Sequence, residues 1–99
     1  MDTIDILCVG EVLVDFIGHQ EGVLINETRD YHRYLGGSPT NVAMNSTRLG
    51  LNTIMVATVG NDGFGSYITE RLSSVGVNTN HLNVLENKST SVFFVARSE

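Results

Sequence analysis

The sequence predicts an α/β fold built on a parallel sheet. Short runs rich in β-branched residues alternate with segments whose apolar residues recur at helical spacing. Of the 99 residues, 41% are hydrophobic and 17% are charged, a composition typical of a folded domain rather than a disordered chain. Because strands that alternate with helices join through right-handed crossovers, we expect the strands to be parallel.

The chain begins with two apolar runs. Residues 4–9 are nearly continuously apolar and stop at Gly10, which predicts a strand buried on both faces. Residues 12–17 form the second run, which only Asp15 interrupts. Residues 18–30 are mostly polar, so we expect a mobile flap or a short hairpin outside the core.

A helix is predicted over residues 39–49. Ser38 is suited to cap its N-terminus, and Pro39 fits the first helical position because its missing N–H would be unpaired there. Gly50 can end the helix in the left-handed conformation. The residues that share its predicted core face are Val42, Ala43, Ser46 and Leu49.

The second half repeats the alternation of strand and helix. Residues 52–59 predict a strand, and the glycine-rich residues 60–65 predict a turn that opens a second helix. A short apolar element follows at 82–85, and 91–96 predict a last strand. The apolar residues at helical spacing in the second helix are Phe64, Ile68, Leu72 and Val75, with Gly76 at its end.

Charge and hydropathy exclude several partners. The chain carries 11 acidic and 6 basic residues, a formal charge of −5, whereas nucleic-acid binding needs clustered cations. No apolar run approaches the roughly 20 residues of a membrane span, and the start is acidic, unlike a signal peptide. We therefore expect a cytoplasmic protein that binds neither nucleic acid nor membrane. The histidines match no metal-ligand spacing, and Cys8 should be a buried thiol.

Asp15 is the first candidate for ligand binding. A carboxylate among apolar neighbours is costly unless it finds hydrogen-bond donors. Sugar hydroxyls are suitable donors, but backbone N–H groups would serve a purely structural role equally well. Gly36 and Gly37 could let a ligand approach the backbone, and Asn41 offers both a donor and an acceptor. The alternative for these three is a simple turn with a capping asparagine.

The glycine-rich turn at 60–65 is a weaker candidate. Its order is G-x-x-G-x-G, whereas a dinucleotide-binding loop has G-x-G-x-x-G. We therefore interpret it as a tight turn before a helix, and Asp62 as a turn residue rather than a catalytic base.

Several segments together resemble a known family. GGSPTNVA at 36–43, followed by Gly50 and Gly60, is similar to the N-terminal signature of the PfkB carbohydrate kinases, the ribokinase superfamily. The resemblance extends through GEVLVD at 10–15, GNDGFG at 60–65, LSSVGV at 72–77 and TSVFFV at 90–95. These segments span nearly the whole chain, in the order and spacing of the family. They look more like fructokinases, 2-keto-3-deoxygluconate kinases or 5-dehydro-2-deoxygluconate kinases than adenosine kinases.

The resemblance implies a ribokinase-like, Rossmann-type parallel sheet with a small β-sheet lid, to which residues 12–35 and 89–99 would partly belong. The remainder of residues 1–99 would form the α/β core. The implied sugar-binding residues are Asp15, Gly36, Gly37, Asn41 and Phe94, although Phe94 could equally pack inside the lid. Arg97 could reach the carboxylate of a sugar acid, but a solvated terminal arginine is the simpler interpretation.

The resemblance also implies what these residues lack. The family's second signature, a Gly-Ala-Gly-Asp stretch with the catalytic base and the anion hole, does not occur in the sequence, and the ATP–Mg²⁺ site belongs to the same missing region. We therefore expect a sugar kinase, fructokinase-like first, in the full-length protein and no kinase activity in the 99 residues alone. The alternative is a non-catalytic sugar-binding or dimerisation module, since homodimers through lid strands occur in the family.

Overall fold

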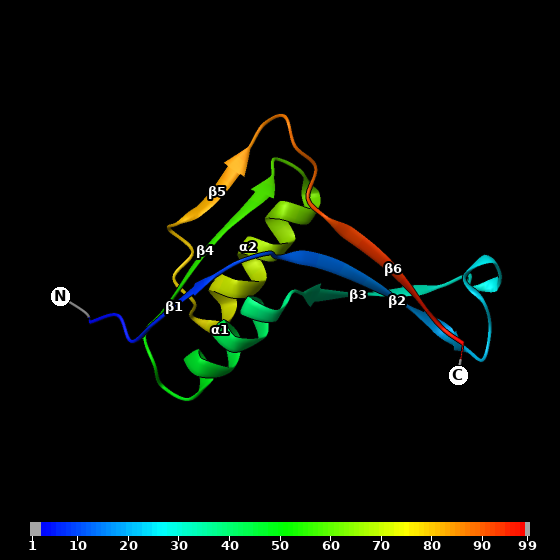
Figure 1. The fold of residues 1–99 in the computed structure, drawn as a ribbon, viewed down its shortest axis with the longest axis horizontal. Coiled ribbons are helices and arrows are strands. Elements are labelled where there is room, and N and C mark those ends of the chain that lie inside the picture. The colour runs from blue at the N-terminus through cyan, green and yellow to red at the C-terminus, as the bar shows by residue number, and fades with distance from the viewer. Residues whose placement is uncertain (1–2, 99) are drawn as a thin grey trace.

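The computed structural model describes residues 3–98 and contains two three-stranded sheets and two α-helices (Figure 1). The first sheet, called the core sheet here, has the strand order β1-β4-β5 and is entirely parallel. The second sheet has the order β3-β2-β6 and projects away from the core sheet and the helices. Termini 1–2 and 99, which the predicted domain range includes, lie outside the described residues.

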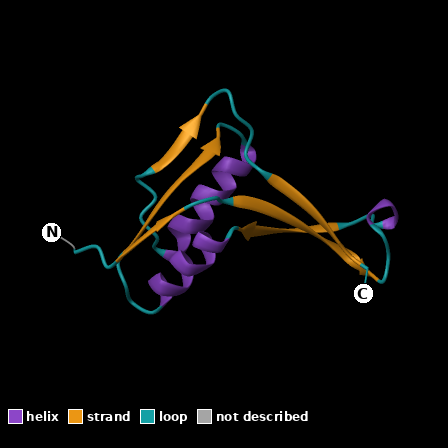
Figure 2. Cartoon of the chain, viewed as in Figure 1, coloured by secondary structure: helices purple, strands orange, loops and turns teal. Residues whose placement is uncertain are grey.

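The elements follow the predicted alternation, with shifted ends. The core sheet contains β1 (Ile6–Val9), β4 (Thr53–Gly60) and β5 (Leu82–Leu85), and the second sheet contains β2 (Leu13–Glu21), β3 (Tyr31–Gly36) and β6 (Val92–Arg97). The helices are α1 (Ser38–Arg48) and α2 (Gly63–Val75), and a short 3-10 helix, η1, spans Ile25–Glu27 (Figure 2). The predicted flap is therefore largely ordered as the end of β2, η1 and the approach to β3.

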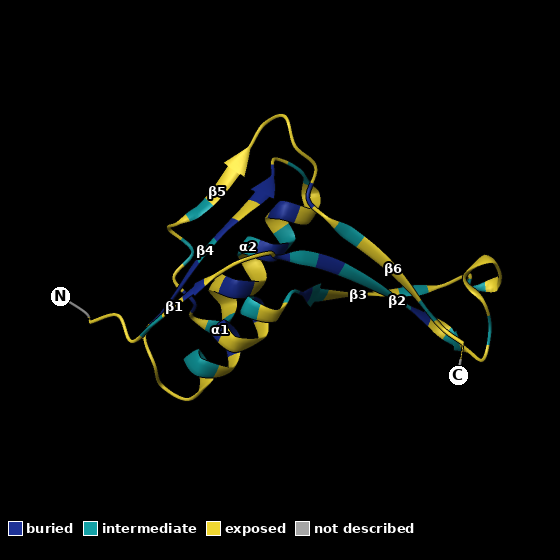
Figure 3. Cartoon of the chain, viewed as in Figure 1, coloured by how far each residue is buried: buried dark blue, intermediate teal, exposed yellow. Residues whose placement is uncertain are grey.

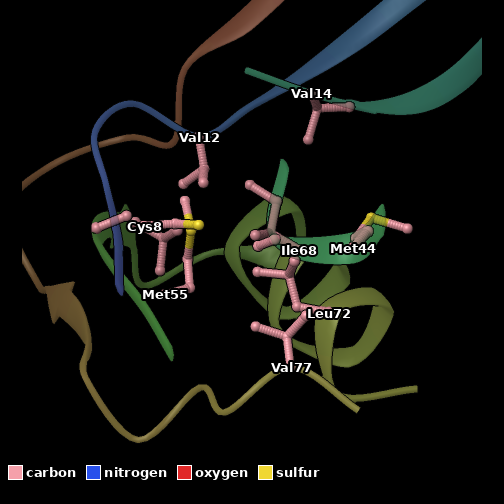
Figure 4. Close-up of a cluster of buried hydrophobic side chains, with 11 residues drawn as sticks. Cys8, Val12, Val14, Met44, Met55, Ile68, Leu72 and Val77 are labelled. Carbon is pink, nitrogen blue, oxygen red and sulfur yellow. The ribbon is translucent and has the colours of Figure 1, made fainter. Parts of the chain in front are cut away.

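The core lies between the core sheet and the two helices. Its buried side chains come from the helices, from β1 and β4, and from the start of β2 (Figure 4). Met55, Ile68 and Leu72 are completely buried. The Cys8 thiol is buried as predicted, and this burial raises its pKa. No helix within residues 3–98 has the length and apolar character needed to cross a membrane.

Two predictions about burial are wrong. Strand β1 is not buried on both faces, because Leu7 and Val9 are 60% and 65% exposed on the face that the helices leave uncovered (Figure 3). On the predicted core face of α1, Ala43 is buried, but Val42 and the C-cap residue Leu49 are 52% and 82% exposed. The other buried residues of α1 are Thr40 and Met44.

The start of α1 also differs from the prediction. Gly37 rather than Ser38 occupies the N-cap, and Ser38 is already the first helical residue. Gly37 can take this place because its φ is +102°, a conformation that favours glycine. Gly50, with a φ of +94°, and Gly76, with a φ of +105°, follow the two helices as predicted.

Candidate functional site

Asp15 lies near the start of the middle strand of the second sheet, between two aromatic residues. On the middle strand, β2, it is the register partner of Tyr34 on β3 and of Phe93 on β6. Because directly opposed residues point to the same side of a sheet, the three side chains share one face. Tyr34 and Phe93 are 47% and 51% exposed, and Asp15 is half-buried. This face, called the Asp15 face here, presents one carboxylate flanked by two accessible rings.

The carboxylate of Asp15 has no hydrogen-bond or ion-pair partner among residues 3–98. It lies beside Gly36, where an added Cβ would be 2.5 Å from Asp15 Oδ2 and 2.4 Å from Leu13 Cδ1. The missing side chain at Gly36 therefore provides the space in which the carboxylate lies. Both carboxylate oxygens remain available to accept hydrogen bonds from a ligand.

Gly36 and Gly37 connect this face directly to the N-terminus of α1. An added Cβ on Gly37 would lie 2.3 Å from the backbone oxygen of Glu11, so no side chain fits there. The Gly37 carbonyl accepts a hydrogen bond from the Asn41 N–H at 3.4 Å, which places the exposed Asn41 one turn into the helix. The fold thus brings Asp15, Gly36 and Gly37 together, and Asn41 follows within one helical turn.

Phe94 lies on the opposite face of the second sheet. It is the register partner of Phe16, and the two rings are stacked with centroids 5.1 Å apart. The Tyr31 ring meets Phe94 edge-on at 5.2 Å. These contacts favour the packing alternative for Phe94, and Phe93 is the residue that accompanies Asp15. Sequence reasoning missed Phe93 because the parallel pairing of β2 with β6, which sets the register, has no local signal.

Arg97, the remaining candidate, and a pair of histidines also lie on the second sheet. Arg97, on β6, forms an ion pair with Glu21 at the end of β2. On neighbouring strands, the rings of His19 and His32 lie 5.7 Å apart, a proximity that their separation in sequence does not suggest. Within residues 3–98, no group of three or more His, Cys, Asp or Glu residues could hold a metal ion.

Asp62 is the N-cap of α2, in agreement with its interpretation as a turn residue. Its Oδ1 accepts hydrogen bonds from the Gly65 N–H at 2.8 Å and from the Thr90 hydroxyl at 2.7 Å. Its Oδ2 accepts a hydrogen bond from the Thr90 N–H at 2.9 Å. Because these donors favour the ionised form, led by the Thr90 N–H, they hold the pKa of Asp62 below its usual value.

Two curated relatives are similar to the chain over most of its length. An ATP-dependent 6-phosphofructokinase from Thermoanaerobacterium thermosaccharolyticum is 40% identical over 95 residues, which is 96% of this chain and 29% of the relative. A 5-dehydro-2-deoxygluconokinase from Geobacillus kaustophilus is 33% identical over 96 residues, 97% of this chain and 28% of the relative. The chain therefore spans less than a third of either relative.

Solved structures share the fold. A fructokinase from Halothermothrix orenii superposes with a TM-score of 0.90 at 33% identity, over 96% of this chain and 34% of the fructokinase. A candidate ribokinase II from E. coli, in complex with ATP and Mg²⁺, gives a TM-score of 0.91 at 28% identity, over 98% of this chain and 32% of that protein. The model of the pfkB family carbohydrate kinases matches residues 3–99. This match, with the shared fold and the sequence identity, shows that the chain belongs to the pfkB family of carbohydrate kinases.

Proposed function

We propose that the protein containing this chain transfers the γ-phosphate of ATP to a hydroxyl of a sugar or sugar acid, and that the chain supplies the sugar-binding side. A fructose-like sugar is the first candidate substrate. The second sheet, with parts of residues 12–35 and 89–99, acts as a lid over the sugar. The proposed reaction takes place in the cytoplasm, where ATP is supplied.

The unpaired carboxylate of Asp15 carries this proposal. One carboxylate can accept hydrogen bonds from two neighbouring hydroxyls, and such charge-assisted bonds are stronger than neutral ones. The rings of Tyr34 and Phe93 flank it on the same face, where they can cover the apolar C–H side of a sugar. Gly36 and Gly37 allow backbone approach, and Asn41 adds a donor and an acceptor. Phe93 replaces Phe94 in the proposed set of sugar contacts.

The remaining parts of the reaction are assigned to residues outside these 99. Phosphoryl transfer requires a base near the attacking hydroxyl and charge stabilisation by Mg²⁺ and oriented N–H groups. The two relatives are more than three times as long as this chain, which leaves room for a catalytic base, an anion hole and an ATP–Mg²⁺ site. The support for ATP and Mg²⁺ is the similar structure that contains both.

Titration of the chain with fructose, followed by backbone amide NMR, tests the sugar-binding part. We expect shifts at Asp15, Gly37 and Asn41 in the wild type and none in Asp15→Asn. Phe94→Tyr, on the opposite face, is the matched control and should bind like the wild type. Shifts that persist in Asp15→Asn would show that the sugar binds elsewhere. A separate assay of the 99 residues with ATP and fructose should give no sugar phosphate.

A second candidate role, self-association, rests on strand β6. Its outer edge has no strand partner among residues 3–98, and Phe93, Phe94 and Val95 are 51%, 56% and 43% exposed. Exposed apolar edge strands tend to pair with other chains, so a homodimer through the second sheet is the proposed assembly. Sedimentation equilibrium should show a dimer that Val95→Lys converts to a monomer. A wild-type monomer at all concentrations would contradict this role.

A further inference from the structure

Two strands of the second sheet, and the segment that leads into the third, contact the start of α2. Phe64 meets the Phe16 ring of β2 edge-on, with centroids 5.7 Å apart. The guanidinium of Arg33 on β3 lies 3.9 Å from the centre of the Tyr67 ring. Asp62, the N-cap of the same helix, binds Thr90, two residues before β6. These contacts all lie on the face opposite Asp15 or at the strand end, so they leave the Asp15 face open.

The Asp62–Thr90 contact differs from the other two because it is a closed polar network. The Thr90 hydroxyl donates to Asp62 and accepts a hydrogen bond from the Gly60 N–H at 2.9 Å. Thr90 is only 7% exposed, so its polar atoms depend on these partners. The network joins the end of β4, the start of α2 and the approach to β6 in one cluster.

The backbone segments around this network are so close together that no side chain fits at Gly60 or Gly65. An added Cβ on Gly60 would lie 2.2 Å from the Lys88 oxygen and 2.7 Å from the Thr90 nitrogen. An added Cβ on Gly65 would lie 2.2 Å from the Gly60 oxygen. Immediately beyond, the Ser91 carbonyl accepts the first hydrogen bond from β2, at 3.0 Å from the Val14 nitrogen. The position of Thr90 therefore determines where β6 joins β2.

We propose that Asp62 is a positioning residue that, through Thr90, fixes the orientation of the second sheet relative to the core sheet. The other two contacts, Phe16–Phe64 and Arg33–Tyr67, join partly exposed side chains that can shift relative to each other. The hydrogen bonds of the Asp62–Thr90 network instead hold Thr90 at one position. Because Phe93 lies three residues after Thr90, the position of Thr90 also determines where Phe93 lies beside Asp15. Asp62 makes no contact with the sugar in this arrangement.

Residual dipolar couplings of backbone amides test the proposal on the chain itself. The couplings of β1, β4 and α1 define one alignment tensor, and those of β2 and β3 define a second. In the wild type and in Thr90→Ser, which keeps the hydroxyl, one common tensor should fit both groups. In Thr90→Val and Asp62→Asn the second sheet should require its own, smaller tensor. Thr69→Val is the matched control, because its hydroxyl bonds only the Gly65 carbonyl within α2.

A common tensor in both Thr90→Val and Asp62→Asn would overturn the proposal. Loss of the folded amide signals of both sheets together, in either variant, would also overturn it. If Asp62 and Thr90 only hold the second sheet in place, their substitution should disorder that sheet before the core sheet. Loss of order in β2 and β3 while β1 and β4 keep their wild-type signals would support it.

The effect on ligand binding rests on the proposed function and is measured separately. Fructose affinity should fall about five- to tenfold in Asp62→Asn and be unchanged in Thr69→Val, as expected when one charge-assisted network is lost. If the wild-type chain does not bind fructose, the proposed function fails for this sugar, while the dipolar couplings still decide the role of Asp62.

Discussion

Asp15 and Asp62 lie in two different regions of the molecule, and their carboxylates have opposite surroundings. Asp62, at the turn between β4 and α2, accepts three hydrogen bonds from Gly65 and Thr90. Asp15, on the middle strand of the second sheet, accepts none from residues 3–98. Both are partly covered by neighbouring groups, so exposure does not separate them. What separates them is whether the fold itself supplies the donors.

This difference distinguishes a structural carboxylate from one that is available to a ligand. The hydrogen bonds of Asp62 are used within the fold, so its removal should change stability and the placement of β6. Asp15 contributes little to the fold that its substitution could remove. Substitutions measured on the chain separate the two roles.

Gly60→Ala should have the largest effect. The added methyl group would lie 2.2 Å from the Lys88 oxygen and 2.7 Å from the Thr90 nitrogen, and this backbone nitrogen is itself part of the Asp62 network. We expect the free energy of unfolding in urea to fall by about 3 kcal/mol or more, the range of severe steric substitutions. Gly63→Ala, with no atom within 4 Å of its new methyl group, should change it by less than about 1 kcal/mol. Equal losses in both variants would contradict the steric reason.

Asp15→Asn should weaken fructose binding at least about tenfold, which corresponds to about 1.4 kcal/mol. The amide keeps the shape of the side chain but loses the charge and one acceptor. Because no described residue bonds the carboxylate, the free energy of unfolding should stay within about 0.5 kcal/mol of wild type. Calorimetric titration and urea unfolding measure the two quantities. A strongly destabilised variant would mean that Asp15 is a structural residue like Asp62.

Phe93→Ala and Phe94→Ala should separate the two faces of the second sheet. Phe94→Ala removes the contacts with Phe16 and Tyr31, so the free energy of unfolding should fall by about 1 kcal/mol. Phe93→Ala should lower fructose affinity and leave stability nearly unchanged. The two substituted residues are adjacent in the sequence, and their side chains point to opposite faces of the sheet. The reverse pattern would restore Phe94 as the wall of the sugar site.

The smallest effect concerns pH. The hydrogen bonds from Thr90 and Gly65 hold the pKa of Asp62 below its usual value, so their contribution is present above about pH 4, the pKa of an unfolded aspartate, and is lost as pH falls through the folded pKa. The stability difference between wild type and Asp62→Asn should therefore shrink below about pH 4. For Thr69→Val, which alters no titratable group, the difference should be the same at each pH. Urea unfolding at several pH values measures both.

Local patterns in the sequence predicted most of the elements but not how the second sheet is assembled. Helical spacing of Ile68 and Leu72 predicted α2, Pro39 predicted the start of α1 to within one residue, and the glycines after each helix predicted where both end. The exposure of Leu7 and Val9 was not predictable, because a continuous apolar strand does not indicate which of its faces is covered. The proposal of Phe93 in place of Phe94 has a similar cause, since a one-residue change in register reverses every side chain. The apolar neighbours of Asp15 and the family resemblance both indicated this residue, and the structure adds that its carboxylate has no partner among residues 3–98.

The pairing of Asp15 with Phe93 has a consequence for the order of folding. α1, β4 and α2 follow one another in the chain, so their contacts can form early and at low entropic cost. The pairing of β2 with β6 closes a loop that contains nearly all the rest of the chain, and such contacts form slowly. Pulse-labelled amide exchange should therefore protect Met55 and Leu72 before Phe16 and Val95. The Asp15 face would then be completed last, on a core that has already folded.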